Sequence, residues 1–378
     1  MPAASCMQEA TMTLEPATRL IHSGHSREQG TPSVPPIVIA SYFTSHGDPR
    51  EVPFAYGRHG NPTWEALEAA LGSLEDAHAV VFASGQAASH ALMLSLTEDR
   101  TRLVLPHDGY YNTRQLASLL RGIEPVVLDL QDLAAVQAAL TGAPAVLWVE
   151  TPTNPLLRVL DLERLGALAR EAGAPMVVDN TVATAILQQP LEWGAVASLY
   201  SLTKAASGHA DVILGAVTTR DERLVQRLRT WRTVAGGIAG PFEAWLALRG
   251  LKTLPLRIRR QSETALAIAQ YLATHRRVRR VYYPGLNPDT LAIARRQMPD
   301  GFGPLLSFEL DGDAAAADAV VAAARLIRPG TSFGGVESSW ERRARWPSET
   351  APESLIRLSV GLEAPQDLIA DLDAALAA

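Results

Sequence analysis

Seven short apolar runs alternate with helical patterns through the middle of this chain. The stretches between most of the runs repeat apolar side chains at helical spacing, as in residues 86–96 and 162–172. Buried strands that alternate with helices typically form a mostly parallel sheet. We therefore expect an α/β fold with these runs as the strands of its large domain. The runs are residues 79–83, 102–105, 125–128, 145–149, 175–178, 197–200 and 212–217.

The segments on either side differ from this pattern. Residues 1–56 hold several prolines and little helical periodicity, which predicts an extended N-terminal arm. Residues 57–240 contain the alternating pattern and are the expected large domain. From 241 to 378, a long helical pattern broken near Gly250 and Pro255 is followed by strands and alanine-rich helices. This part is expected to form a smaller α+β domain.

Polar residues follow several of the predicted strands. In a parallel sheet the carboxyl ends of the strands meet at one edge, where ligands bind. Taken singly, these residues have ordinary structural explanations, such as a helix start at Ser84, a turn at Asn154 or an N-cap at Asp179. Together they place a phosphate-binding loop, an aromatic ring, a carboxylate and a lysine on one edge. They are Ser84, Gly85, Gln86, Tyr110, Asn154, Asp179, Ser201, Thr203 and Lys204.

Lysine is scarce in this chain. Lys204 and Lys252 are the two lysines among 34 basic residues, so arginine holds almost every other basic position. Arginine stays protonated and cannot act as a nucleophilic amine, whereas a desolvated lysine can. Lys204 follows an apolar run and is a candidate for chemistry, with a plain surface lysine as the alternative. Lys252 fits a solvated or ion-paired residue.

Composition excludes several classes of protein. A net charge of −6 disfavours a nucleic-acid-binding protein, and no apolar run is long enough to span a membrane. Cys6 is the single cysteine, so an internal disulfide and a cysteine-rich metal site are excluded. No spacing indicates any other metal site, and the first 20 residues lack the features of a signal peptide. We expect a cytoplasmic protein.

A lysine, an aspartate, an aromatic ring and a phosphate pocket suit pyridoxal 5′-phosphate (PLP). The lysine forms a Schiff base with this cofactor, and the carboxylate keeps the pyridine nitrogen protonated, so that the ring withdraws electrons. The aromatic side chain stacks on the ring, and N–H and hydroxyl groups bind the phosphate.

With these residues in place, the chain resembles the Cys/Met-metabolism (transsulfuration) family of PLP-dependent enzymes, of fold type I. The resemblance covers the chain from about residue 18 to its end and keeps the family's motif order. It implies a seven-stranded large domain, a PLP cofactor and a homodimer with shared active sites, usually doubled to a homotetramer. The matching motifs begin at Tyr56, Ser84, Asp108, Glu150, Val178, Ser201, Gly208, Ser332 and Arg357.

The resemblance also implies a role for each site residue. Lys204 would carry the cofactor and shuttle protons, Asp179 would pair with the pyridine nitrogen, and Tyr110 would stack on the ring. Arg357 matches the residue that binds the substrate α-carboxylate, with Ser332 beside it. Asn154 matches the residue facing the ring hydroxyl. Phosphate contacts match Gly85, Gln86, Ser201 and Thr203, and the pair that reaches the neighbouring subunit's cofactor matches Tyr56 and Arg58.

The chain departs from the family pattern in three places. Gln86 replaces a usual methionine, which a backbone contact to phosphate tolerates. Tyr111 and Asn112 replace a usual Gly-Gly beside the stacking tyrosine, so the pocket wall is expected to be bulkier or more polar. After Glu337 the chain is unusually rich in arginine. The sequence of residues 331–346 is most similar to that of a bacterial subgroup labelled cystathionine γ-lyase.

These residues leave several reactions open. The resemblance favours cystathionine γ-lyase, which converts L-cystathionine to L-cysteine, 2-oxobutanoate and ammonia. Glu337 matches an acidic position that receives the distal amino group of a long substrate, although it could instead pair with Arg342 or Arg343. Cystathionine γ-synthase, cystathionine β-lyase and methionine γ-lyase are the alternatives. Asn112, where methionine γ-lyases often have cysteine, disfavours the last of these. A non-catalytic PLP-binding protein is the remote alternative.

Overall fold

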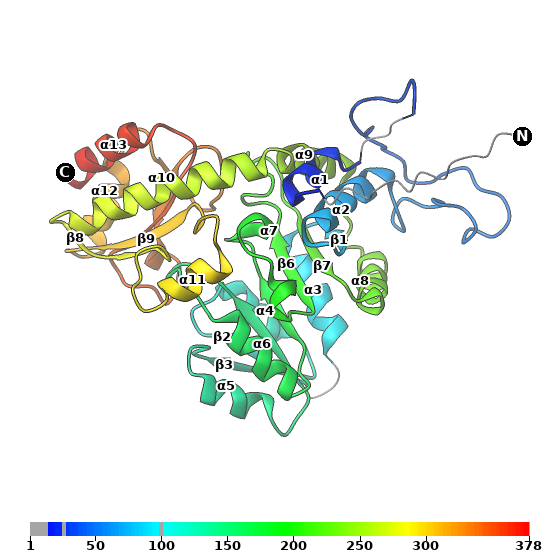
Figure 1. Cartoon of the computed structure of the whole chain (residues 1–378), viewed down its shortest axis with the longest axis horizontal. Helices are drawn as coiled ribbons and strands as arrows, with labels where there is room; N and C mark the ends of the chain where they lie inside the picture. The colour runs from blue at the N-terminus through cyan, green and yellow to red at the C-terminus, as the bar shows by residue number, and fades with distance from the viewer. Residues whose placement is uncertain (1–13, 25–27, 98–100, 378) are drawn as a thin grey trace, which may run out of the picture.

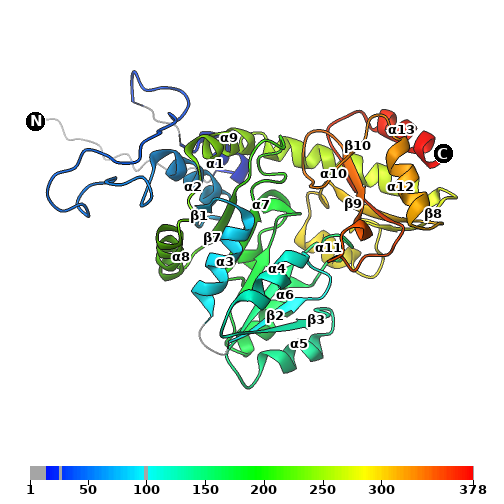
Figure 2. The ribbon, with the colours of Figure 1, turned by 180° about the vertical axis from the view of Figure 1, so that it is seen from behind.

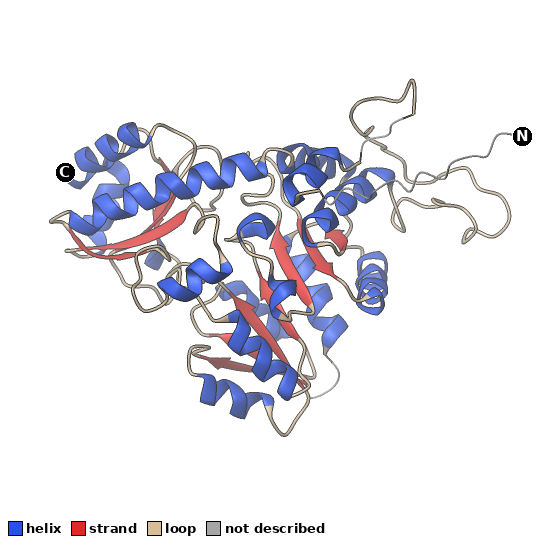
Figure 3. Cartoon of the chain, viewed as in Figure 1, coloured by secondary structure: helices blue, strands red, loops and turns tan. Residues whose placement is uncertain are grey.

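The computed structural model describes residues 14–24, 28–97 and 101–377. The first 13 residues of the expected arm, including Cys6, lie outside these ranges. The described chain forms a large domain, a smaller domain beside it, and an arm that projects from the large domain at the end opposite the C-terminus (Figures 1 and 2). Figure 3 shows strands in both domains with helices packed around them.

A seven-stranded sheet forms the centre of the large domain, in the order β1-β7-β6-β5-β4-β2-β3. The five strands from β2 to β6 run parallel, whereas β7 is antiparallel to both of its neighbours. This confirms the predicted mostly parallel sheet. The strands are β1 (His78–Phe82), β2 (Thr101–Pro106), β3 (Ile123–Leu128), β4 (Ala145–Glu150), β5 (Met176–Asp179), β6 (Ala197–Ser201) and β7 (Gly215–Thr219).

The direction of β7 follows from its connection. A strand that returns parallel to its neighbour needs a crossover, usually a helix. Residues 202–214, which link β6 to β7, contain no helix, so the chain turns back and pairs antiparallel. Lys204 lies in this turn, directly after β6, where the chain leaves the carboxyl edge of the sheet.

Helices cover both faces of the sheet. In β4, Val146 and Trp148 pack in the cluster that includes α3 and α8, whereas Leu147 and Val149 pack in the cluster with α5 and α6. This alternation buries both faces of the strand, as a doubly covered sheet requires. The helices are α2 (Pro62–Glu75), α3 (Gly85–Leu96), α4 (Tyr111–Leu119), α5 (Leu133–Leu140), α6 (Leu162–Glu171), α7 (Thr184–Leu187), η1 (Pro190–Trp193) and α8 (Glu222–Ala235).

The smaller domain contains a five-stranded sheet in the order β10-β11-β12-β9-β8. Helices α10, α12 and α13 bury their apolar side chains in one cluster with its strands. The strands are β8 (Val278–Tyr282), β9 (Leu305–Leu310), β10 (Arg328–Pro329), β11 (Ser339–Arg342) and β12 (Leu355–Ser359). The helices are α10 (Leu254–Thr274), α11 (Leu291–Gln297), α12 (Ala314–Ala323), η2 (Arg343–Arg345) and α13 (Pro365–Ala377).

The two domains are joined by a pair of helices. Helix α9 (Pro241–Leu251) packs against α2 of the large domain, and α10 continues into the smaller one. The interruption at residues 252 and 253 falls where the sequence predicted a break. No helix in the described ranges combines the length and hydropathy that crossing a membrane would require.

The sequence analysis expected an extended arm, but the arm is not extended throughout. It contains a short helix, α1 (Pro16–His22), because Leu20 becomes fully buried in the cluster that includes Leu67 of α2. Beyond it the arm leaves large apolar side chains in solvent, with Ile39 82% and Tyr42 75% exposed. Apolar exposure of this kind is typical of a surface that another chain covers.

Candidate active site

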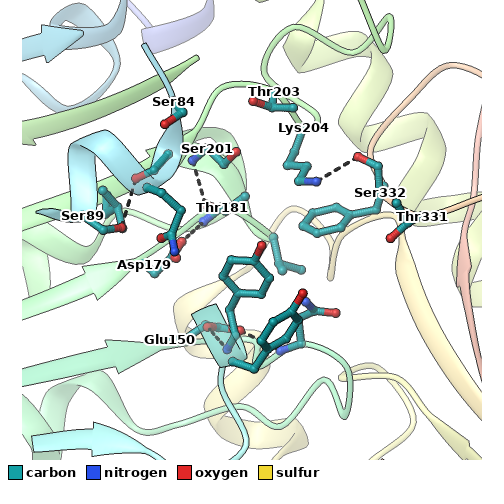
Figure 4. A pocket seen from close by; sticks show the side chains of 18 of the residues that line it. Ser84, Ser89, Glu150, Asp179, Thr181, Ser201, Thr203, Lys204, Thr331 and Ser332 are labelled. Atoms are coloured by element: carbon teal, nitrogen blue, oxygen red, sulfur yellow. Dashed lines mark hydrogen bonds between the residues drawn. The ribbon is translucent and has the colours of Figure 1, made fainter. Parts of the chain in front are cut away.

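A cavity of about 340 Å³ lies at the carboxyl edge of the large sheet, closed on its other side by residues of the small domain. This is the edge at which the sequence placed the candidate residues. Figure 4 shows Lys204 directed toward Ser332, away from Asp179 and Thr181. The predicted residues that line the cavity are Ser84, Gly85, Gln86, Tyr110, Asn154, Asp179, Ser201, Thr203, Lys204, Ser332 and Arg357.

The N-terminus of α3 forms one end of the cavity. Ser84 caps the helix by accepting a hydrogen bond from the Ala87 N–H at 3.0 Å, which leaves the first-turn amides of Gly85 and Gln86 beside the cavity. A Cβ at Gly85 would come within 3.1 Å of the Ser201 side chain. The position therefore favours glycine, and the exposed helix N-terminus forms a site for an anion such as a phosphate.

Two carboxylates, buried Glu150 and half-buried Asp179, lie at the ends of neighbouring strands. Glu150 and Asp179 are register partners in β4 and β5, and no arginine or lysine within the described ranges forms an ion pair with either. Glu150 accepts the N–H groups of Tyr110 at 2.7 Å and Asn154 at 2.8 Å. Asp179 accepts the N–H of Thr181 at 3.0 Å. Burial raises the pKa of both carboxyls, and the charge of Asp179 raises the pKa of Glu150 further.

Lys204 has no carboxylate partner within the described ranges. Its Nζ donates to Ser332 Oγ at 2.8 Å and lies 4.9 Å from the centre of the Phe333 ring. Burial, followed by the nearby charge of Arg357, lowers the pKa of Lys204 to about 8. At pH 7 a group with such a pKa is about one-tenth free amine, far more than an ordinary lysine. The amine is thus suited to nucleophilic and proton-transfer chemistry.

The small-domain loop that meets Lys204 is tightly constrained. Ser332 has a positive φ of 104°, which is rare for a residue other than glycine. Gly334 has a φ of 83°, and a Cβ there would lie 2.4 Å from the Ala205 N. Its own N–H donates to Ser359 Oγ at 2.8 Å. These contacts press the loop against the turn that carries Lys204 and fix the Ser332 hydroxyl beside the amine.

Arg357 on β12 is almost fully buried beside the cavity. Its Nη1 donates to Asn154 Oδ1 at 2.8 Å, and its Nη2 donates to the Ser332 carbonyl at 2.9 Å. Burial lowers the pKa of Arg357 to about 10, so the group stays cationic at neutral pH. Ser332 therefore contacts both cations, Lys204 through its hydroxyl and Arg357 through its carbonyl. A substrate carboxylate bound at Arg357 would lie close to the amine of Lys204.

Tyr110 begins α4 beside the cavity. Its hydroxyl accepts a hydrogen bond from Asn112 Nδ2 at 2.9 Å, and its ring centre lies 5.2 Å from that of Tyr111. Burial raises the pKa of the Tyr110 phenol, so it is neutral at physiological pH. Asn112 itself does not line the cavity and acts on it through Tyr110.

Three other expected site residues lie outside this cavity. Tyr56 is 43% exposed, and Arg58 donates to the Thr233 carbonyl at 2.8 Å. Glu337 is exposed, and in the described chain Arg342 and Arg343 form ion pairs with other carboxylates rather than with Glu337. Thr203 lines the cavity, but its hydroxyl is engaged with the backbone of Leu214.

Several residues of the site were not identified from the sequence. Thr181 and Glu150 belong to motifs that were already recognised at the ends of predicted strands. That location was the signal that could have identified them as site residues. Arg343 and Trp346 line the cavity from the small domain, and buried Glu341 lies behind them. The sequence offered only an arginine-rich segment with no assigned role, because its contacts depend on the packing of β11 and η2.

The residues present fit PLP. Asp179 is a half-buried carboxylate without an ion-pair partner in the described chain, and Lys204 is a half-buried amine without one. The α3 N-terminus offers free amides to a phosphate, in a cradle that a side chain at Gly85 would narrow. Asp179 would hold the ring nitrogen, Lys204 the aldehyde carbon and Tyr110 one ring face. No cluster of three potential metal ligands occurs within the described ranges.

Comparisons with known proteins point to the same cofactor. Residues 17–377 match the family described as Cys/Met metabolism PLP-dependent enzyme. A Streptomyces coelicolor protein named as a candidate cystathionine γ-lyase is 43% identical, covering 91% of this chain and 89% of that protein. Cystathionine γ-synthase of Mycobacterium tuberculosis is 41% identical, covering 96% of each chain.

A solved structure of Micromonospora echinospora CalE6 has a TM-score of 0.90 and 41% identity, covering 97% of this chain and 100% of that one. CalE6 is described there as a cystathionine γ-lyase and in another structure as a methionine γ-lyase. These relatives share a family but not a single reaction. The chain therefore belongs to the Cys/Met metabolism family of PLP-dependent enzymes.

Proposed function

We propose that this enzyme is a cystathionine γ-lyase. It would convert L-cystathionine and water to L-cysteine, 2-oxobutanoate and ammonia by α,γ-elimination. The observation that carries amino-acid chemistry is the shared contact of Ser332 with Lys204 Nζ at 2.8 Å and with Arg357 Nη2 at 2.9 Å. Similarity to the Streptomyces protein, which is named as a candidate cystathionine γ-lyase, supports the choice of γ-lyase within the family.

Each step that the protein performs follows from a positioned side chain. PLP supplies an electron-withdrawing ring that stabilises negative charge at the substrate Cα. Arg357 binds the α-carboxylate through its planar guanidinium, which orients the Cα–H bond. Lys204, with a pKa of about 8, removes the Cα proton and returns a proton to the product. γ-Elimination also requires a proton to leave Cβ, so Lys204 would have to move along the substrate to take it.

The alternatives share these residues and differ in the substrate side chain. If this chain were a cystathionine γ-synthase, cystathionine β-lyase or methionine γ-lyase, its α-amino-acid substrate would still bind at Arg357. Lys204 would still be the base. Asn112 supports the tyrosine at a position where methionine γ-lyases often have cysteine, which disfavours that activity. Glu337 remains a proposed contact for the distal amino group, although it lies outside the cavity of its own chain.

Incubation with L-cystathionine alone distinguishes these reactions. We expect 2-oxobutanoate and cysteine as products, formed at least about tenfold faster than 2-oxobutanoate from methionine, because one missing polar contact costs at least this much. Mass spectrometry of derivatised 2-oxo acids measures both. Pyruvate with homocysteine would indicate β-lyase instead. Turnover only with an O-acylated homoserine and cysteine together would indicate γ-synthase. A holoenzyme inert in every combination would support a binding protein.

We also propose that the enzyme works in the cytoplasm as a homodimer with shared sites, assembled into a homotetramer. Tyr56 and Arg58 lie outside their own cavity, and the arm beside them exposes Ile39 and Tyr42. A second subunit would cover this apolar surface and receive the Tyr56–Arg58 pair at its phosphate site. Light scattering during size-exclusion chromatography is expected to give about four times the 40.6 kDa chain mass. A monomer that retains full activity would contradict shared sites.

A further inference from the structure

Glu341 is a buried carboxylate next to the substrate-binding arginine. It lies on β11 as the register partner of Arg357 on β12, and it is 1% exposed. Its Oε1 accepts a hydrogen bond from Arg357 Nη2 at 2.8 Å. Within the described ranges it is the one carboxylate that forms an ion pair with Arg357. The pair is thus set by strand register in the small domain.

The same carboxylate organises the adjoining wall of the cavity. Oε1 also accepts from Arg343 Nη1 at 2.6 Å and from Thr331 Oγ1 at 2.9 Å. Oε2 accepts from Trp346 Nε1 at 3.0 Å and from Arg345 Nε at 3.1 Å. Arg343, Thr331 and Trp346 all line the cavity. Both oxygens are therefore occupied, and one side chain ties four neighbouring donors to Arg357.

The negative charge of Glu341 has an effect of its own, in addition to these hydrogen bonds. Arg357, Arg343 and Lys204 are three cations around one cavity, and Glu341 contacts two of them. Burial alone would raise the pKa of Glu341, but Arg357, the Trp346 N–H and Arg343 hold it below its usual value. The carboxylate is therefore ionised at neutral pH. It offsets the repulsion that would otherwise displace the Arg357 guanidinium from Lys204.

We propose that Glu341 is a positioning residue for the substrate: it orients Arg357 toward the α-carboxylate and fixes Trp346 and Arg343 as one wall of the cavity. Substrate contact is made by Arg357 and the wall, not by Glu341 itself. The proposal assigns a role to the arginine-rich segment 341–346. It rests on the proposed carboxylate-binding role of Arg357 but not on which elimination the enzyme performs.

The test compares Glu341→Gln with wild type, both as holoenzyme, using L-alanine and ethylamine, which differ by the carboxylate. Dissociation constants come from the change in visible absorbance on titration. Wild type should prefer alanine. Loss of a charge-assisted hydrogen bond to Arg357 should reduce that preference about 10- to 100-fold. KM for the amino-acid substrate should rise by a similar factor, with kcat changed less than about threefold.

Glu363→Gln is the matched control. Glu363 also anchors this loop, accepting from the Ser338 N–H at 2.6 Å and from Ser338 Oγ at 2.8 Å, but it has no contact with Arg357. The preference of the Glu363→Gln variant for alanine over ethylamine should equal that of wild type. Glu341→Asp, which keeps the charge, should recover part of the preference, and this rescue excludes unfolding as the cause.

Three other outcomes have separate meanings. If wild type prefers alanine and Glu341→Gln does so equally, this inference is overturned while the role of Arg357 stands. If wild type itself does not distinguish alanine from ethylamine, the proposed carboxylate-binding role of Arg357 fails, and this inference fails with it. A loss of preference in Glu363→Gln equal to that in Glu341→Gln would also overturn it, since both variants would then act through loop stability alone.

Discussion

Lys204→Ala is expected to lower kcat on the amino-acid substrate by about 10⁴-fold, the upper end of what a positioned general base contributes. The variant removes the amine that lies 2.8 Å from Ser332 Oγ in the cavity. The visible absorbance of the Schiff base between lysine and cofactor should disappear as well, because no other lysine lines the cavity. Steady-state kinetics and an absorption spectrum of the purified protein measure both effects.

The chain provides its own control for this variant. Lys252→Ala removes the other lysine, which lies outside the cavity, and should leave the spectrum and kcat unchanged.

Unfolding is not expected to explain the loss of activity in Lys204→Ala. Since burial lowers the pKa of Lys204 to about 8, the folded protein binds fewer protons than the unfolded chain between pH 8 and the ordinary lysine pKa of 10.5. The charge thus costs stability below pH 8, and cofactor-free Lys204→Ala should melt no earlier than wild type. Retained activity and colour would contradict the assignment.

Asp179→Asn is expected to lower kcat by about 10²- to 10³-fold, the range for removing one group that stabilises developing charge. The asparagine keeps the shape and can still accept the Thr181 N–H, but it cannot hold a proton on the pyridine nitrogen. PLP should therefore still bind, with weaker affinity, while catalysis fails. Parallel measurement of kcat and of cofactor affinity by equilibrium dialysis separates these two effects.

The stability of cofactor-free Asp179→Asn gives the sign of the electrostatic effect. Burial raises the pKa of Asp179, so the folded state binds this proton more tightly than the unfolded chain. Stability of the wild type should consequently fall as pH rises through the raised pKa, and the variant should lose this part of the dependence. At neutral pH the variant should melt at the same or a higher temperature. A lower melting temperature with unchanged kcat would instead mean a structural role.

Much of the fold was predictable because it depends on local patterns. The apolar runs and helical spacing placed every strand of the large sheet to within a few residues. The start of α2 also depends on a local signal, because the side chain of Asn61 accepts the Thr63 N–H at 2.8 Å and caps the helix. The helix α1 was missed because it owes its stability to burial of Leu20 against α2 rather than to its own periodicity.

The site was predictable where it lies at strand ends and not where it depends on domain packing. Asp179, Tyr110 and Lys204 follow strands of one sheet, so their convergence follows from the topology of a parallel sheet. Glu341 meets Arg357 only because β11 pairs with β12 in a particular register, which a one-residue slip would undo.

The sequence by itself determined the fold class, the family and the cofactor, and it singled out Lys204 as the candidate catalytic lysine. Lys204 is one of only two lysines in the chain and follows a buried apolar run, so the chemistry expected of it is that of an amine. Tertiary structure alone decided the environment of that amine. It brought a strained small-domain loop and two buried arginines against Lys204, which lowers its pKa, and it left Glu337 outside the cavity. The physical reason is that desolvation and charge depend on neighbours distant in the chain, whereas strand and helix periodicity depend on residues close in it.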